Sequence, residues 1–169
     1  MLIRQNKKGQ VATIDLFLAI MIFTLIITTV LFTWNSYNAK IDKQIEYNSN
    51  LIKAYHISDL LVKYSGKPSS WHQSTIEDNE ILIIGLAKED RVIDPDKLTR
   101  FLSFEYDLAR EKLNINSYEF YFKISEINGD DLNPTIEYGN MTDSESAVVI
   151  RRYVIYEERE TILEFWLQK

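Results

Sequence analysis

LFLAIMIFTLIITTVLFTW, residues 16–34, is a run of nineteen residues without one charged side chain. As an α-helix it would be about 28 Å long, close to the thickness of the hydrocarbon core of a bilayer. A helix in the core of a soluble domain is rarely apolar on every face over such a length. The run therefore predicts a membrane-inserted helix, and Asp15 is the only charged residue between Lys8 and Lys40.

Three interpretations of this apolar stretch differ in where the chain is cut. A cleaved secretory signal has an apolar core of about 7–15 residues followed by small residues at the cut, and residues 32–36, FTWNS, are unlike such a site. A signal anchor that is never cut fits well. A cut on the other side, before the apolar stretch, also fits, because the basic leader ends there in Gly9-Gln10.

The charges around the stretch predict its orientation. Residues 1–9 contain no acid, and they carry three basic residues, Arg4, Lys7 and Lys8. The positive-inside rule then keeps the N-terminus in the cytoplasm and places the residues after about Trp34 outside. Trp34 and Tyr37 stand where an interfacial aromatic belt would lie, although ordinary aromatic residues on a helix surface give the same pattern.

The short leader Lys-Lys-Gly-Gln, followed by an uninterrupted apolar helix with one acid near its start, resembles the type IV pilin superfamily. The Gly-Gln junction is similar to the archaeal class III signal peptide group, whose mature chains begin with Gln and have a hydroxyl residue at position 3 and Glu at position 5. The matching residues are Gln10, Thr13 and Asp15. Asp15 is the sixth residue counted from Gln10 and the fifth counted from Val11, and it is Asp where the group has Glu.

The resemblance implies a set of partners. A prepilin peptidase would cut at Gly9-Gln10-Val11, which removes residues 1–9 or 1–10. Other pilin subunits, a pilus assembly platform and membrane lipid would then surround the apolar helix. For Asp15 the resemblance implies a contact with the N-terminal amine of a neighbouring subunit, which sets axial register.

The residues alone leave a second interpretation of Asp15 open. A carboxylate in the middle of a membrane costs about 2.5–3.5 kcal/mol on insertion scales, and such groups usually have a partner. Asp15 is close to the start of the helix, where the cost is smaller. A carboxylate at the cytoplasmic interface would reach water and would face the positive end of the helix dipole.

Composition narrows the classes of function. The chain has 169 residues, enough for one membrane helix and one modest domain. It has no cysteine, which excludes disulfides and thiolate metal sites. Its formal net charge is −6, which argues against a nucleic-acid-binding surface.

An amphipathic helix is predicted to continue the membrane helix into water as far as about Tyr64. Gly66-Lys67-Pro68 would end it, because Gly suits a helix C-terminus and Pro cannot continue the helix. Apolar residues fall largely on one face of this segment, at helical spacings, and predict the face that packs on the following domain. They are Tyr37, Ile41, Ile45, Ile52 and Tyr55. A stalk or a short coiled coil would give a similar pattern.

The remainder predicts a small α+β domain. Residues 80–85 are expected as a buried strand, and Asp94-Pro95 as the start of a helix, with a second helical piece over 103–113. A half-buried strand is expected over 118–125, then a turn at 129–134 and a loop to about 146. Two final strands, 147–156 and 161–167, should form a hairpin. Trp71 and His72 are expected to pack in a loop.

No constellation of residues indicates an enzyme or a cofactor site, and we expect none. The two histidines, His56 and His72, are not in a metal-binding spacing, the five glycines are scattered, and no nucleophile elbow is present. Arg151-Arg152 would point to opposite faces of a strand, so salt bridges are favoured over a joint anion clamp. Asn140-Met141-Thr142 is an N-glycosylation sequon in a predicted exposed loop.

These observations predict four segments: a prepilin-type leader over 1–9, a filament-core helix over 10–36, an amphipathic helix over 37–66 and a head over 67–169. The fold class is α+β, a long membrane-spanning helix extended by an amphipathic helix that packs on a small antiparallel C-terminal sheet, as in pilins. The predicted function is that of an archaeal type IV pilus-like filament subunit. The alternative is an uncleaved, single-span membrane protein with an extracytoplasmic binding domain, and a membrane-bound enzyme comes third.

Overall fold

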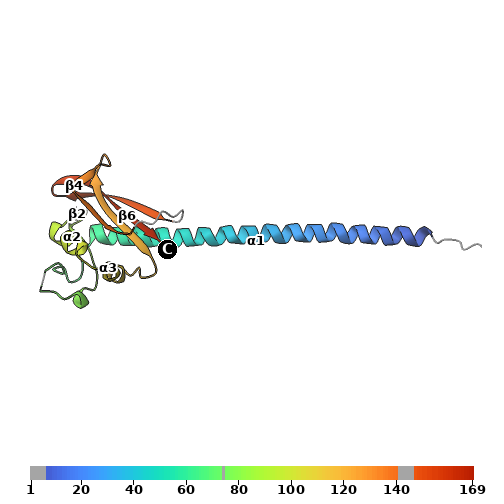
Figure 1. The fold of residues 1–169 in the computed structure, drawn as a ribbon, viewed down its shortest axis with the longest axis horizontal. Helices are drawn as coiled ribbons and strands as arrows, with labels where there is room; N and C mark the ends of the chain where they lie inside the picture. Colours follow the sequence, from blue (N-terminus) through green and yellow to red (C-terminus); the bar gives the residue numbers. More distant parts are fainter. Residues whose placement is uncertain (1–6, 74, 141–146) are drawn as a thin grey trace, which may run out of the picture. The chain divides into compact units, whose positions relative to one another are not determined.

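The computed structural model describes residues 7–73, 75–140 and 147–169. The chain divides into two compact units, the N-terminal unit Met1–Ile45 and the head unit Glu46–Lys169. Helix α1, Lys7–Lys63, begins in the first and ends in the second (Figure 1). The head unit continues with η1 Asp78–Glu80, β1 Ala87–Glu89, β2 Val92–Ile93, α2 Pro95–Leu102, α3 Tyr106–Lys112, β3 Glu119–Glu126, β4 Asp131–Gly139, β5 Val148–Tyr156 and β6 Arg159–Gln168.

One six-stranded sheet, in the order β1-β2-β5-β6-β3-β4, organises the head unit. The predicted α+β class is confirmed, but the prediction of a purely antiparallel sheet is wrong, because β2 runs parallel to β5. That parallel contact is short: Val92 is the register partner of Ile155, and the Ile155 amide donates to the Arg91 carbonyl at 2.8 Å. All other neighbouring strands are antiparallel.

The C-terminal hairpin is confirmed. Strands β5 and β6 pair without a break from Val148 opposite Leu167 to Tyr156 opposite Arg159. Glu157 and Glu158 form the two-residue turn, with φ angles of 50° and 63°. Positive φ at both central positions is the geometry that matches the twist of a hairpin, and Asn-Gly is the sequence that adopts it most easily.

Glu158→Gly should therefore stabilise the head unit by about 0.5–1 kcal/mol, because glycine adopts this backbone conformation without the clash that glutamate meets. The change also removes one of several neighbouring negative charges. Urea unfolding followed by tryptophan fluorescence measures the effect. Glu111→Gly, at an exposed position inside α3, is the matched control and should destabilise by about 1 kcal/mol. Equal losses in both variants would contradict the argument.

Two predictions between residues 80 and 146 are wrong. Residues 80–85 form no strand: Glu80 ends η1, Ile81 and Ile84 are buried in an irregular segment, and Ile83 makes only an isolated bridge with Lys67. The expected loop after residue 134 is instead β4, which contains Asn133-Pro134. Proline lacks an amide donor and is tolerated on an edge strand, and β4 is the outermost strand next to β3.

The start of α2 is confirmed in detail. The Asp94 carboxylate accepts hydrogen bonds from the amides of Asp96 at 3.0 Å and Lys97 at 3.4 Å, and Pro95 occupies the first helical position. This cap satisfies two of the amides that a helix leaves without an internal partner. Helix α2 buries Leu98 and Phe101.

The face of α1 that packs on the sheet differs from the predicted one. Ile52 and Tyr55 are 59% and 47% exposed, and Tyr37, Ile41 and Ile45 are exposed as well. The buried residues of the last turns follow another helical row, Asn50, Ala54, Ile57, Ser58 and Leu61. The prediction failed because apolar residues stand on more than one side of this helix, and the buried side also includes the polar Asn50 and Ser58.

Trp71 anchors the segment that follows α1, as the expected packing role requires. Its side chain is fully buried, its indole donates to the Gly85 carbonyl at 3.0 Å, and its ring lies 5.8 Å from that of Phe104. A β-carbon on Gly66, whose φ is +87°, would lie 2.4 Å from the indole ring. Glycine at this position therefore lets the chain turn around the tryptophan.

Candidate functional site

The most unusual surface of this protein is the part of α1 in the N-terminal unit. Its large apolar side chains from Ile14 to Trp34 are between 41% and 73% exposed. Among the described residues, α1 is the one helix long and apolar enough to cross a membrane, and its most apolar window is not buried at all. A core helix of a soluble protein has a similar composition but is mostly covered. This surface therefore fits a nonpolar environment.

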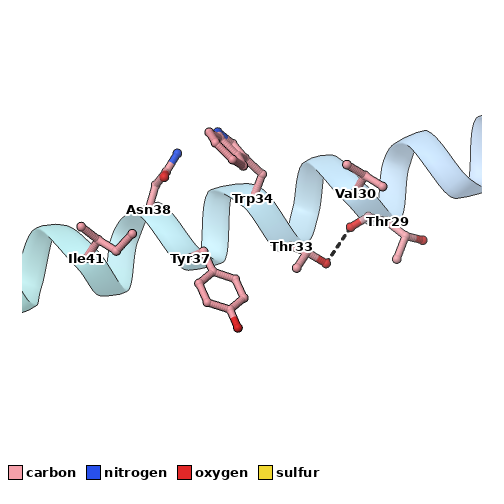
Figure 2. A pocket seen from close by; sticks show the side chains of 7 residues that line it. All are labelled: Thr29, Val30, Thr33, Trp34, Tyr37, Asn38 and Ile41. Carbon is pink, nitrogen blue, oxygen red and sulfur yellow. Dashed lines mark hydrogen bonds between the residues drawn. The ribbon is translucent and has the colours of Figure 1, made fainter.

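The hydroxyl groups on this surface are bonded inside the helix. Thr24, Thr28, Thr29 and Thr33 each donate to the carbonyl four residues earlier, at 2.7–2.8 Å. Figure 2 shows one of these bonds, from Thr33 to the Thr29 carbonyl. The helix thus offers methyl groups to its surroundings even at its polar positions.

The C-terminal end of the apolar stretch carries two aromatic residues on neighbouring parts of one helix face. Figure 2 shows the rings of Trp34 and Tyr37 projecting above and below the helix in this view. The shallow hollow between them along the helix is lined by Thr29, Val30, Thr33, Trp34, Tyr37, Asn38 and Ile41. A hollow on the surface of one helix does not enclose a ligand, but the two amphipathic rings suit the interface between lipid and water.

The residues of the predicted leader junction lie at the beginning of α1. Lys7, Lys8, Gly9, Gln10 and Val11 belong to its first two turns. Arg4 lies outside the described residues. Asp15 is an exposed residue one turn further along the same helix.

The arginine pair behaves as predicted for neighbouring residues of a strand. Arg151 pairs with Glu164 of β6, with Nε 2.5 Å from Oε1. Arg152 points to the other side of β5, where a guanidinium nitrogen lies 2.9 Å from the Asp59 carboxylate of α1. Its guanidinium also lies 4.1 Å from the centre of the Tyr55 ring. Arg152 therefore ties α1 to the sheet, and the two arginines form no joint site.

A groove of about 530 Å³ lies beside the last turns of α1. Its walls combine apolar side chains with the cations of Lys53 and Lys112, and His56 contributes to it as well. The Lys53 ammonium lies 4.3 Å from the centre of the Tyr118 ring, so this charge is already engaged. No group of three or more possible metal ligands occurs among the described residues.

Strands β3, β4, β5 and β6 carry a row of charges on the outer face of the sheet, which is the face opposite the buried Phe122 and Phe165. This row was not identified from the sequence. Arg151, Glu164, Lys123 and Glu137 are register neighbours on adjacent strands. Tyr121 donates a hydrogen bond to Glu137 at 2.8 Å. Burial, followed by this bond and the surrounding carboxylates, raises the pKa of Tyr121 to about 12. The sequence patterns could not bring these charges together, because they fixed no strand order and indicated a loop at Glu137.

Asn140 follows β4 directly and is exposed, and its backbone N–H donates to the Phe120 carbonyl. Met141 and Thr142, the rest of the sequon, lie outside the described residues.

Comparison with known proteins adds no identification. No family model, no curated protein and no solved structure gives a significant match to this chain.

Proposed function

We propose that this chain is a pilin-like structural subunit, major or minor, of an archaeal type IV pilus-like surface filament. The observation that carries the proposal is the uncovered apolar surface of α1 between Ile14 and Trp34, which directly follows a short basic leader. A subunit of this kind needs a helix that is stable first in lipid and then among neighbouring helices. Its head remains outside and carries any adhesion or capping task.

Assembly through this helix needs little free energy per residue, because neighbouring side chains replace lipid of similar polarity. Close approach between helices favours small and β-branched positions, and Ala19, Thr24, Thr28 and Thr29 provide them. The threonine hydroxyls, bonded within their own helix, demand no partner from a neighbour. Asp15 is the remaining polar group, and a neighbouring N-terminal amine released by the peptidase would neutralise it.

The alternative is an uncleaved membrane anchor, and the sequence feature that favours it is the imperfect spacing of Asp15 from Gln10. The leader junction separates the two proposals. A filament subunit requires Gly9 for cleavage by a prepilin peptidase, whereas an anchor requires only the basic charges before the helix.

The first test is the N-terminal residue of the native protein purified from membranes, determined by mass spectrometry of its terminal peptide. We expect a start at Gln10 or Val11. The variant Gly9→Val should keep the leader, and Ala12→Val, the matched change on the other side of the junction, should still be cut. A wild-type chain that begins at Met1 or Leu2 would overturn the filament proposal and leave the anchor.

A further inference from the structure

The outer face of the sheet in the head unit presents three adjacent rows of side chains. The middle row is the charged one, Arg151–Glu164–Lys123–Glu137. One neighbouring row is Val149–Trp166–Tyr121–Gly139, and the other is Tyr153–Ile162–Ser125–Asp131. Each row crosses β5, β6, β3 and β4 in that order; the first two rows are regular, and the third reaches β4 beyond a register irregularity between Ile124 and Ser125.

This face is most open on β5, where Tyr153 is 71% exposed and the Arg151 side chain is 68% exposed. Further across, the Glu164 and Lys123 side chains are 17% and 24% exposed, and Ser125 is buried. On the opposite face the same strands bury Phe120, Phe122, Leu163 and Phe165. Trp166 and Tyr121, the aromatic pair of the first row, are only partly covered. The head unit therefore has a surface with tryptophan and tyrosine side chains and no described element upon it.

The charges of the middle row alternate in sign from one strand to the next: positive, negative, positive, negative. Pairs within the chain already use part of them, because Arg151 contacts Glu164 and Lys123 lies 2.5 Å from Asp131 of β4. Exposed pairs of this kind contribute only about 0–1 kcal/mol to the stability of a chain. Their arrangement nevertheless determines which surface fits against them.

We propose that this outer face binds the same face of a second copy of the chain, about a two-fold axis parallel to the strands. That rotation reverses the order of the strands, so Arg151 faces the partner's Glu137 and Glu164 faces the partner's Lys123. A two-fold axis across the strands would instead place Arg151 on the partner's Arg151. The pattern is thus complementary to itself in one orientation of the two sheets, which is what a symmetric dimer requires.

The rows on both sides fit the same orientation. Trp166 of each copy faces the partner's Tyr121, so the two-fold axis creates this contact at two places. Aromatic residues of this kind commonly supply most of the affinity at interfaces. Tyr153 faces the partner's Asp131, to which its hydroxyl can donate. Two twisted sheets pack in this aligned manner with their backbones about 10 Å apart. The inference does not rest on the proposed filament or on cleavage of the leader.

A charge-reversal experiment tests the symmetry directly. We purify the full chain and its variants in detergent and measure association by analytical ultracentrifugation. Arg151→Glu and Glu137→Arg should each weaken self-association at least tenfold, because each places like charges opposite one another twice. An equimolar mixture of the two variants should associate again, since the reversed charges then face each other. If the chains associated through α1 alone, neither substitution would change the measured association.

Crosslinking gives the register. The chain has no cysteine, so chains with Tyr153→Cys and chains with Asp131→Cys each carry one unique thiol. A bis-maleimide linker that spans about 10 Å should join the two in a mixture and should join neither variant to itself. Unchanged association of Arg151→Glu, or no recovery in the mixture, would overturn the proposal. Circular dichroism verifies that both charge variants are folded.

Discussion

Trp71→Ala should unfold most of the head unit at conditions where the wild type is intact. Removing a fully buried tryptophan costs about 3–5 kcal/mol through the cavity it leaves, and it also leaves the Gly85 carbonyl without its indole donor. Marginal stability of about 5–15 kcal/mol is typical of such domains, so this loss is a large fraction of the total.

The chain contains its own control for this experiment. Trp34 is 65% exposed and lies in the N-terminal unit. Trp34→Ala makes the same chemical change and should leave the unfolding of the head unit within about 0.5 kcal/mol of the wild type. Guanidinium unfolding in detergent, followed by far-ultraviolet circular dichroism, compares the two. Equal losses in both variants would show that Trp71 does not anchor the core.

Replacing Ile22, Leu25 and Ile26 by arginine should abolish membrane insertion. Each arginine near the centre of a helix costs about 2.5–3.5 kcal/mol, whereas each large aliphatic residue contributes about 0.3–0.6 kcal/mol. Three arginines therefore cost about 9 kcal/mol, more than the roughly 5 kcal/mol that all large apolar residues of 16–34 supply. Leu25→Arg alone costs about 3 kcal/mol and should still insert.

Carbonate extraction of membranes measures the result. We expect the triple variant in the soluble fraction or degraded and the single variant in the membrane pellet. Arginine at three exposed apolar positions of the head unit, Tyr64, Leu82 and Ile127, adds the same charge and should not change the fraction. A triple variant that stays in the pellet would refute the assignment of this helix to lipid.

Local signals account for what the sequence predicted correctly. The uninterrupted apolar run indicated the exposed helix, and Asp94-Pro95 indicated the capped start of α2. Alternation of apolar and polar residues indicated β3 and the β5–β6 hairpin. Each of these depends on neighbours within a few residues, so no knowledge of the rest of the fold was needed.

The errors arise where the partner is distant along the chain. Asn133-Pro134 has the composition of a turn, and only its position on the edge of the sheet lets it join β4. Asn50 and Ser58 are polar yet buried, because the sheet packs on their side of α1. The charged row on the outer face depends on the order of β5, β6, β3 and β4, which no local pattern specifies.

The threonines of α1 have a consequence for motion. Each of the four hydroxyl protons is already held by the helix's own backbone, so turning or sliding the helix against lipid or against another helix breaks none of these bonds. Only shape resists such a movement along most of the apolar stretch. Between Leu16 and Trp34 the helix therefore offers no hydroxyl donor that would resist rotation or sliding. Polar interactions that fix its position would have to come from residues at its two ends.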